Sequence, residues 1–331
     1  ALFRGSEAAE GVVRPLIDAG LVDPRGLAYH AGTGALFVAD VGQGSIFRYI
    51  LEAVPCSRAK CGGVGVELRV DGTQVLIVED VQAPYVAVDA AGDLFFTDQR
   101  RNLVCRIQSE TIQRLAHTNM AAADLQYVPV QQVPPWSRAS GRPQIILLYR
   151  GDVLPLVRVP AGIDSDGVRV AWSNVEPEHS AAYAGGGGAP SVALASAAAY
   201  PMNVDNHVEA RMLSASTGTF GDVLLTNMMA LYTAADADIF GVCQRDGRTV
   251  LVSDGLGEPR GLAWGGAGTA YVADSAASAV YSFPVGSCHD DLPLRRVASF
   301  HGVFGLAVIR APDLARSGAF DDGSTWASYF L

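Results

Sequence analysis

Residues 24–50 read PRGLAYHAGTGALFVADVGQGSIFRYI, and residues 259–283 read PRGLAWGGAGTAYVADSAASAVYSF. Both segments begin with PRGLA and continue into an apolar run, LFVAD or AYVAD, that ends in an aspartate. Residues 84–107, PYVAVDAAGDLFFTDQRRNLVCRI, form a third copy. Recurrence of one pattern at widely separated positions indicates that the chain repeats a single structural unit.

Every copy has the same local pattern. A short apolar run is followed by a turn that contains glycine, then by a second run and a second turn, and then by a third run. Short apolar runs between turn residues are typical of β-strands, and we expect four strands in each unit. The fourth runs are QVLIVED (74–80), TIQRLAH (111–117), QIILLYR (144–150), TVLVSDG (249–255) and LRRVASF (294–300).

Three further stretches complete the set of units. VRVAWSN (168–174) and DVLLTN (222–227) keep only the second strand of the pattern, and a sixth copy starts at VFGLAVI (303–309). The predicted second strands end in an acid or amide at separations of 58, 76, 53 and 47 positions. A period near 50 residues with four strands per unit is typical of a β-propeller. The strand-ending residues are Asp40, Asp98, Asn174, Asn227 and Asp274.

We therefore predict one all-β domain over residues 1–331, a six-bladed β-propeller with four-stranded blades. The run GVVRPLI (11–17) stands before the first PRGLA, where a fourth strand is expected. We expect this N-terminal strand to join the last blade and so close the ring, which removes exposed sheet edges. Residues 129–143 and 176–202 depart from the period, and we predict both as long loop insertions on one face.

The units PRGLAY…LFVAD and PRGLAW…AYVAD resemble the NHL and YWTD repeats of six-bladed propellers, and LFFTD (94–98) is close to the YWTD signature itself. The resemblance covers three units well and the others weakly. It implies the fold but no single function, because these families include scaffolds and ligand-binding ectodomains. They also include enzymes, such as the SMP-30/gluconolactonase group, strictosidine-synthase-like proteins and peptidyl-amidoglycolate lyases.

The strand-ending acids and amides allow two interpretations. They could gather a cation, or each oxygen could bond backbone N–H groups of a turn or of the neighbouring blade. Their repetition in nearly every unit favours the structural role, because a catalytic site is asymmetric. Arg25 and Arg260 hold matching places after the turn proline. Each could bind an anionic ligand, but we expect each to clasp a strand-end Asp of a neighbouring blade with paired hydrogen bonds.

An enzyme would need unlike groups at the starts of the innermost strands, where they face the central channel. Glu258, His207 and His301 are the candidates. One carboxylate with amides and one divalent cation, Ca²⁺ or Zn²⁺, would resemble the lactonase site of the SMP-30 group, whereas histidines from several blades would resemble the amidating-lyase zinc site. A single histidine at a strand start is more often a satisfied polar residue.

Composition and charge limit the classes of partner. The chain is 49% apolar and 18% charged, which excludes disorder, and its formal net charge is −10. An acidic chain without basic runs is not expected to bind nucleic acid. No apolar run reaches the roughly 18 residues of a membrane span.

The five cysteines suggest a compartment. Cys56 and Cys61 frame the short insert CSRAKC, which could close as a disulfide or carry two free thiols. Cys105 and Cys243 stand in strand-like runs where a buried thiol is expected, and Cys288 lies in a predicted loop. The pattern assigns no pairing to these three residues. The CSRAKC pair and the missing initiator methionine favour the cell exterior or an organelle lumen.

From these observations we expect a non-catalytic propeller, without a cofactor, that binds a protein or assembles into a larger complex. The nearly symmetric motif residues and the long loops support this function. The alternative is a metal-dependent lactonase or hydrolase that acts on a small molecule in the central channel.

Overall fold

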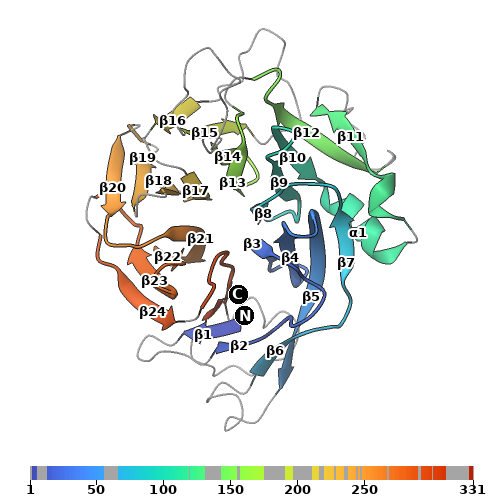
Figure 1. The fold of residues 1–331 in the computed structure, drawn as a ribbon, viewed down its shortest axis with the longest axis horizontal. Helices are drawn as coiled ribbons and strands as arrows, with labels where there is room; N and C mark the ends of the chain where they lie inside the picture. The colour runs from blue at the N-terminus through green and yellow to red at the C-terminus, as the bar shows by residue number, and fades with distance from the viewer. Residues whose placement is uncertain are drawn as a thin grey trace.

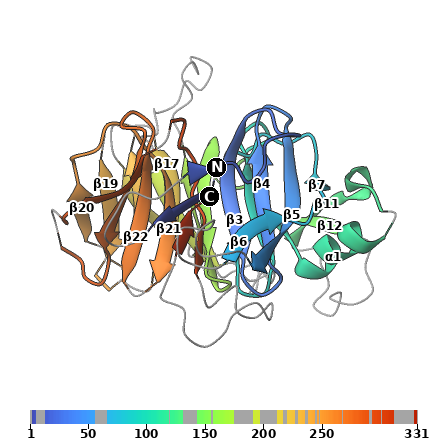
Figure 2. The ribbon, with the colours of Figure 1, turned by 90° about the horizontal axis from the view of Figure 1, so that it is seen from below.

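The structure of this chain, a computed structural model, is a ring of β-sheets around one axis (Figure 1). The side view in Figure 2 shows that the strands run roughly along this axis. The structure describes residues 2–5, 13–55, 66–118, 120–130, 143–154, 157–174, 191–196, 211–215, 220–226, 229–234, 238–243, 245–246, 248–266, 268–289, 292–299, 301–310 and 328–330.

The described residues form six sheets, which we number in the order in which the chain reaches their innermost strands. Sheets 3, 4 and 5 are four-stranded meanders, in which the spatial order of the strands equals the chain order. Sheet 3 contains β13 (Pro160–Ser165), β14 (Arg169–Asn174), β15 (Ser191–Ser196) and β16 (Arg211–Ala215). Sheet 4 contains β17 (Phe220–Leu225), β18 (Met229–Ala234), β19 (Ile239–Cys243) and β20 (Thr249–Ser253). Sheet 5 contains β21 (Pro259–Gly266), β22 (Thr269–Asp274), β23 (Ala279–Pro284) and β24 (Arg295–Ser299).

Sheets 1 and 2 each contain a fifth strand. Sheet 1 contains β3 (Pro24–His30), β4 (Ala35–Asp40), β5 (Ser45–Pro55), β6 (Val66–Val70) and β7 (Val75–Val78). Sheet 2 contains β8 (Val86–Val88), β9 (Leu94–Asp98), β10 (Leu103–Ile107), β11 (Gln126–Pro129) and β12 (Gln144–Arg150).

The prediction of an all-β propeller is confirmed, but four strands per blade is wrong for sheets 1 and 2. In sheet 1, β5 is 11 residues long, so that its first part pairs with β7 and its second part pairs with β6. In sheet 2, β11 runs parallel to β12 at the outer edge. Both extra strands extend the sheets away from the ring axis.

Sheet 6 combines strands from both ends of the chain. Its order is β2 (Val13–Arg14), β1 (Leu2–Gly5), β26 (Ser328–Phe330) and β25 (Val308–Arg310). β1 pairs antiparallel with β26, so the ring is closed by hydrogen bonds between the two ends. The prediction placed one N-terminal strand here, at residues 11–17. The structure has two, because β1 lies between β2 and β26.

The run TIQRLAH, predicted as a strand, belongs to helix α1 (Ser109–His117). Thr111, Ile112 and Leu115 are its buried residues, and their spacing fits one side of a helix better than one face of a strand. The Asp93 carboxylate accepts a hydrogen bond from the backbone N–H of Ser109 at 2.8 Å, which favours a helix start. A 3₁₀ turn, η1 (Ala122–Asp124), follows the helix, and both elements contact β7 of sheet 1.

The two predicted insertions differ in outcome. Residues 176–202 were expected to be a loop, but Ser191–Ser196 form β15, which pairs with β14 and β16. Residues 175–190 and 197–202 lie outside the described residues. In the stretch 129–143, Pro129 ends β11, and residues 131–142 are not described. The alanine-rich composition around β15 concealed a strand that its neighbours stabilise by pairing.

One predicted second strand is an innermost strand. DVLLTN begins within β17, which contacts the innermost strands β13 and β21 on either side. The second strand of sheet 4 is β18, whose final residue Ala234 lies opposite Phe220. Asp40 holds the same place opposite Pro24 in sheet 1. Asn227, predicted to end the second strand, lies outside the described residues. Short apolar runs look alike in either position, and only cross-strand register separates them.

Apolar side chains fill the spaces between neighbouring sheets. Phe37 of β4 and Phe96 of β9 belong to one buried cluster that joins sheets 1 and 2. The rings of Tyr149 on β12 and Trp172 on β14 stack with centroids 5.1 Å apart and join sheets 2 and 3. β4 and β9 are buried along their whole length, which explains why LFVAD and LFFTD are unbroken apolar runs.

The innermost strands approach one another so closely that glycine is required. A Cβ atom on Gly26 would lie 2.5 Å from the Cα of Tyr85, and one on Gly261 would lie 2.5 Å from the carbonyl oxygen of Phe304. The N–H of Gly261 donates a hydrogen bond to that same oxygen at 2.8 Å. The glycine of PRGLA therefore serves the contact between neighbouring sheets, where any side chain would separate the strands.

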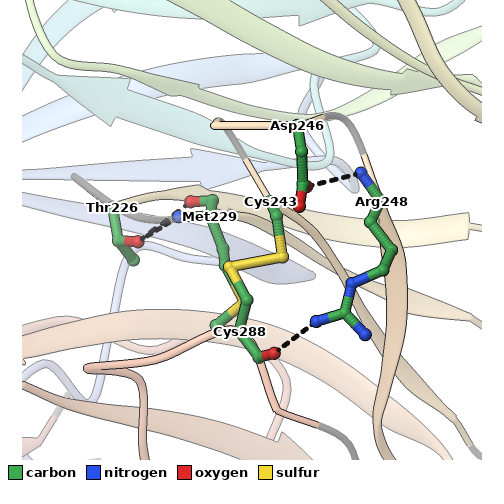
Figure 3. Close-up of a disulfide and its surroundings, with 6 residues drawn as sticks. All are labelled: Thr226, Met229, Cys243, Asp246, Arg248 and Cys288. Carbon is green, nitrogen blue, oxygen red and sulfur yellow. Dashed lines mark hydrogen bonds between the residues drawn. A yellow bond between two sulfur atoms is a disulfide. The ribbon is translucent and has the colours of Figure 1, made fainter.

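A disulfide joins sheets 4 and 5 (Figure 3). It connects Cys243, the last residue of β19, with Cys288 in the segment after β23, across 45 positions of the chain. Beside it, Arg248 donates a hydrogen bond to the carbonyl oxygen of Cys288 at 2.8 Å. The Leu292 N–H also donates to the Val252 carbonyl oxygen, so the segment after β23 is bound to the outer strand of sheet 4.

The disulfide changes the assignment of the cysteines. Cys243 was expected to be a buried thiol, and that expectation is wrong because Cys288 of the next sheet reaches it. Cys105 is a free buried cysteine, as expected. Cys56 and Cys61 lie outside the described residues, so their predicted disulfide stays a prediction.

Replacement of both bridged cysteines, as C243S/C288S, should lower the free energy of unfolding by roughly 2–4 kcal/mol, because a cross-link over a long loop restricts the unfolded chain. Chemical denaturation of the wild type and the double variant measures this difference. C105S serves as the control for loss of a buried sulfur without loss of a cross-link. Equal stability of C243S/C288S and the wild type under oxidising conditions would contradict the assignment.

Candidate functional site

The strand-ending aspartates bind the chain where it enters each sheet. Asp40 accepts hydrogen bonds from the backbone N–H groups of Val22 (2.7 Å), Asp23 (2.9 Å) and Gln43 (3.1 Å). Burial would raise the pKa of Asp40, but these bonds and one from the Gln43 amide together lower it. Residues 22 and 23 lead directly into β3, so Asp40 fixes the entry of the chain into its innermost strand.

Sheet 5 repeats this arrangement. Asp274 accepts bonds from the N–H groups of Gly257 (2.7 Å), Glu258 (2.9 Å) and Ala277 (3.1 Å). Its partners again include the two residues before the innermost strand. The carboxylates at these two positions thus carry out the structural role that we favoured over cation binding.

Sheets 2 and 3 use weaker versions of the same contact. Asp98 accepts bonds from the N–H groups of Arg100 (3.1 Å) and Arg101 (3.3 Å) and from the Arg101 guanidinium (2.7 Å). Asn174 accepts one from the N–H of Arg158 at 2.9 Å. In sheet 4 the equivalent position is Ala234, which has no side-chain acceptor.

The two motif arginines do not clasp strand-end aspartates. Arg25 donates from Nε and Nη2 to one oxygen of Asp23, at 3.1 and 2.9 Å. Arg260 forms an ion pair with Glu258. The predicted partners are wrong because Asp40 and Asp274 are already engaged by backbone N–H groups, which leaves the acid two positions before each arginine as the accessible partner.

The guanidinium groups of both arginines lie over the side chain of one phenylalanine near the axis of the ring of sheets. The Arg25 guanidinium lies 5.3 Å and the Arg260 guanidinium 5.6 Å from the centroid of the Phe304 ring. The ring of Tyr85 lies 5.6 Å from Phe304. These four residues come from sheets 5, 6 and 1 and from the entry to sheet 2, and we call them the axial cluster. The arginine side chains remain about one third exposed, at 39% and 33%.

The axial cluster is electrostatically coupled to a buried carboxyl group. Burial raises the pKa of Tyr85 far above its usual value, the negative charge of Asp222 raises it further, and Arg260 and Arg25 oppose this effect. Asp222 on β17 is 8% exposed. Its side chain accepts bonds from the N–H groups of Val223 and Leu262, at 2.9 and 2.8 Å.

No functional role was predicted for Asp222 or for its neighbour Asp164 on β13. The Asp164 carboxylate accepts hydrogen bonds from the backbone N–H groups of Ser165 and Leu225, at 2.8 and 2.7 Å. The only signal in the sequence is the context: carboxylates stand within the apolar runs PAGIDS and FGDVLL, where the other copies have small or apolar residues.

Two of the three candidate residues of the enzyme hypothesis, Glu258 and His301, lie in the part of the chain that the structure describes. Glu258 is bound by Arg260 and by the Ser275 hydroxyl group. His301 is exposed in the segment before β25, and His207 lies outside the described residues. Among the residues whose positions are described, no group of three or more histidine, cysteine, aspartate or glutamate side chains is arranged to hold a metal ion. In the same part of the chain, no helix has the length and apolarity that a membrane crossing requires.

Comparison with known proteins identifies the fold. No protein-family model and no curated protein sequence matches the chain. A chain of a nidogen/laminin complex matches with a TM-score of 0.53 and 14% sequence identity, over 86% of this chain and 84% of that one. A gluconolactonase from Xanthomonas campestris matches with a TM-score of 0.54 and 12% identity, over 94% and 86%. The chain has the fold of these propellers.

The structural likeness matches the resemblance that the repeat motifs carry. A third solved structure, a luciferin-regenerating enzyme, matches with a TM-score of 0.52 and 10% identity, over 100% of this chain and 94% of that one. The neighbours thus include a propeller from a protein–protein complex as well as enzymes. At these identities the likeness concerns the fold alone, and a function has to be argued from the site.

The substitution Asp40→Ala should lower the free energy of unfolding by roughly 2–4 kcal/mol, because three backbone N–H groups lose a charged acceptor. Thermal and chemical denaturation measure the change. Asp71→Ala is the matched control: Asp71 is exposed and accepts one N–H bond, from Thr73 at 2.8 Å. A loss for Asp40→Ala no greater than that of the control would refute the proposed role of Asp40.

Proposed function

We propose that this chain is a non-catalytic, protein-binding propeller, and that its axial cluster recognises an acidic side chain of the partner. Residues 1–331 form one domain in this proposal, and the six sheets are the six blades of one ring. The observation that carries it is the convergence of Arg25 and Arg260, from two different sheets, on the single ring of Phe304.

The arginines retain hydrogen-bond donors for such a partner. A guanidinium group has five N–H donors in a planar fork that suits a carboxylate. Among the described residues, Arg25 uses only Nε and Nη2, and Arg260 uses only Nη2. The Phe304 ring beneath them limits their motion, because a cation over an aromatic face is attracted to it. The cluster therefore presents partly exposed, oriented donors.

The repeated contacts support a binding role rather than catalysis. The carboxylates that recur from sheet to sheet bond backbone N–H groups, which fixes the scaffold. The residues that break the symmetry of the ring, Phe304 and Tyr85, are aromatic, and aromatic and arginine side chains contribute strongly to protein interfaces. The nidogen/laminin neighbour provides a precedent for a propeller within a protein complex.

We place the protein outside the cell or in an organelle lumen. Disulfides persist in oxidising compartments, and the Cys243–Cys288 bridge joins two sheets of the ring. An acidic chain whose formal net charge is −10 also makes nucleic acid an unfavourable partner.

The competing hypothesis, a metal-dependent lactonase, predicts one divalent cation per chain. For the binding propeller we expect less than about one tenth of a divalent cation per chain. Elemental mass spectrometry of protein purified without added metal or chelator decides between them. One Ca²⁺ or Zn²⁺ per chain, together with hydrolysis of lactone substrates, would overturn the proposed function and direct attention to Glu258, His207 and His301.

A short peptide with two central aspartates should bind the wild-type protein, and Arg25→Ala or Arg260→Ala should weaken binding at least tenfold, or about 1.4 kcal/mol. Isothermal titration calorimetry measures both affinities. The same peptide with asparagines in place of the aspartates tests the requirement for charge. Arg295→Ala is the control, because Arg295 is exposed on the outer strand β24 of sheet 5.

Three results would contradict the proposed site. The first is equal affinity for the acidic and the amide peptide. The second is an equal loss of affinity in Arg295→Ala and Arg25→Ala. The third is the absence of binding to the wild type at millimolar peptide.

A further inference from the structure

We call each contact between neighbouring innermost strands a seam, and five of the six seams are of two kinds. At the sixth, between sheets 2 and 3, the Thr97 hydroxyl group donates to the carbonyl oxygen of Ala161 at 2.6 Å. Around sheets 5, 6, 1 and 2 the backbones meet directly at glycines. A Cβ on Gly305 would overlap the carbonyl oxygen of Arg25, and Gly26 and Gly261 face the backbones of the next strands in the same way. At these seams the atoms in contact belong to the backbone and not to a titratable side chain.

Sheets 3, 4 and 5 are joined differently, through carboxyl groups. Asp164 of β13 accepts the N–H of Leu225 on β17 at 2.7 Å. Asp222 of β17 accepts the N–H of Leu262 on β21 at 2.8 Å. Each bond crosses from one sheet to the next, and the two follow one another along the ring, so that sheet 4 is held on both sides by an acid. Asp222 is buried and Asp164 is half-buried.

The Asp222 seam carries a second side-chain bridge. The Thr233 hydroxyl group donates to the carbonyl oxygen of Arg260 at 3.0 Å and accepts the N–H of Asp222 at 2.9 Å. β17, β18 and β21 are therefore joined by a chain of polar contacts that includes Asp222. A change in the charge of Asp222 acts directly on the entry of β21.

The surroundings of both carboxyl groups disfavour their ionised forms. Burial raises the pKa of Asp164 to about 7, although the N–H bonds from Leu225 and Ser165 lower it, and Asp166 raises it further. Burial also raises the pKa of Asp222 well above its usual value, against the bonds from Leu262 and Val223, and Asp164 adds to the increase.

The charged and titratable neighbours come from every element around the pair. Asp166 follows β13 and forms an ion pair with Arg169 at the start of β14. β18 contributes Tyr232, and β21 contributes Arg260. Across the axis, Tyr85 before β8 interacts electrostatically with Asp222, and Arg25 on β3 interacts with Tyr85. The two arginines act on Tyr85, and among the described residues neither forms an ion pair with Asp164 or Asp222.

We propose that the two carboxyl-mediated seams are a proton-dependent latch, which holds sheets 3, 4 and 5 together when Asp164 and Asp222 are protonated and loosens when they ionise. Each carboxyl group accepts the interstrand N–H on one oxygen and the N–H of the following residue on the other. When the second oxygen is protonated, the first still accepts the interstrand N–H, the bond from the following residue weakens, and no charge is buried. Two ionised groups at the same positions repel each other and lack a cationic partner at hydrogen-bond distance among the described residues.

The sign of the effect follows from proton binding. Between pH 4 and pH 7 the unfolded chain has lost these protons while the folded chain retains them, so stability falls as pH rises. Each such group changes the opening equilibrium constant by up to about tenfold per pH unit in this range. The glycine seams have no such dependence, so the change is confined to one arc of the ring.

Hydrogen exchange of the full-length chain, followed by mass spectrometry from pH 4.5 to 8 and corrected for the intrinsic exchange rate, tests the latch. The peptides that contain Leu225 and Leu262 should lose protection at least tenfold as pH rises from 5 to 8, and peptides from β4 should not. In Asp164→Asn and Asp222→Asn the loss should shrink at the altered seam, because asparagine keeps an acceptor and carries no charge.

Asp254→Asn is the control, since Asp254 is exposed directly after β20. If a latch variant does not fold, the pH profile of hydrogen-exchange protection in the wild type still tests the proposal. The proposal is overturned by pH-independent protection of Leu225 and Leu262, or by the same pH dependence in β4. An unchanged profile in both asparagine variants would overturn it too. Peptide binding at the axial cluster is not part of this test, so the two proposals succeed or fail separately.

Discussion

The innermost strands converge on one axis, and the space left there for each residue constrains the rest of the chain. Gly26, Gly261 and Gly305 lie so close to the next strand that a Cβ would meet its backbone. Because sheets 5, 6, 1 and 2 touch at these points, the close approach restricts how each of these four sheets enters the ring. The PRGLA motif recurs because it supplies a strand start with no side chain at the point of contact.

The strand-ending carboxylates hold the entry of the chain in the same geometry in different sheets. Asp40 and Asp274 bind the N–H groups of the two residues before an innermost strand, so they fix the height at which the chain turns inward. Sheet 4 lacks this contact, since Ala234 occupies the position, and there the buried Asp222 and the Thr233 hydroxyl group bond the neighbouring strand instead. The ring thus satisfies one requirement, buried backbone N–H groups with acceptors, by different side chains.

The residues that differ between the repeats are the candidates for a functional site. Arg25 and Arg260 are repeated, but Phe304 and Tyr85 each occur once, and together they form a charged and aromatic cluster near the axis. Tyr85 of this cluster interacts electrostatically with Asp222, which also accepts the N–H of Leu262 on the neighbouring strand β21. A symmetric scaffold with a few unlike residues at its centre is a general way to make a specific site on a repeated fold.

The candidate site was only partly predictable from the sequence. The repeats indicated that Arg25, Arg260 and the strand-ending acids occupy equivalent places, because equivalent positions in a repeat share their local geometry. They did not indicate the partners: Asp23 and Glu258 hold the arginines, and the convergence on Phe304 involves residues about 280 positions apart in the sequence. Asp164 and Asp222 were missed, since an acid within an apolar run carries no signal until a donor on another sheet is placed opposite it.

By itself, the sequence determined that this protein is an all-β propeller built from repeated units, because turn residues and apolar runs act over a few neighbouring residues. Only the tertiary structure decided that TIQRLAH is helix α1, that DVLLTN is an innermost strand, and that Cys243 pairs with Cys288. These outcomes depend on which distant segment lies opposite each run. Register, pairing and burial depend on two segments in contact, and the local sequence of one segment does not specify its partner.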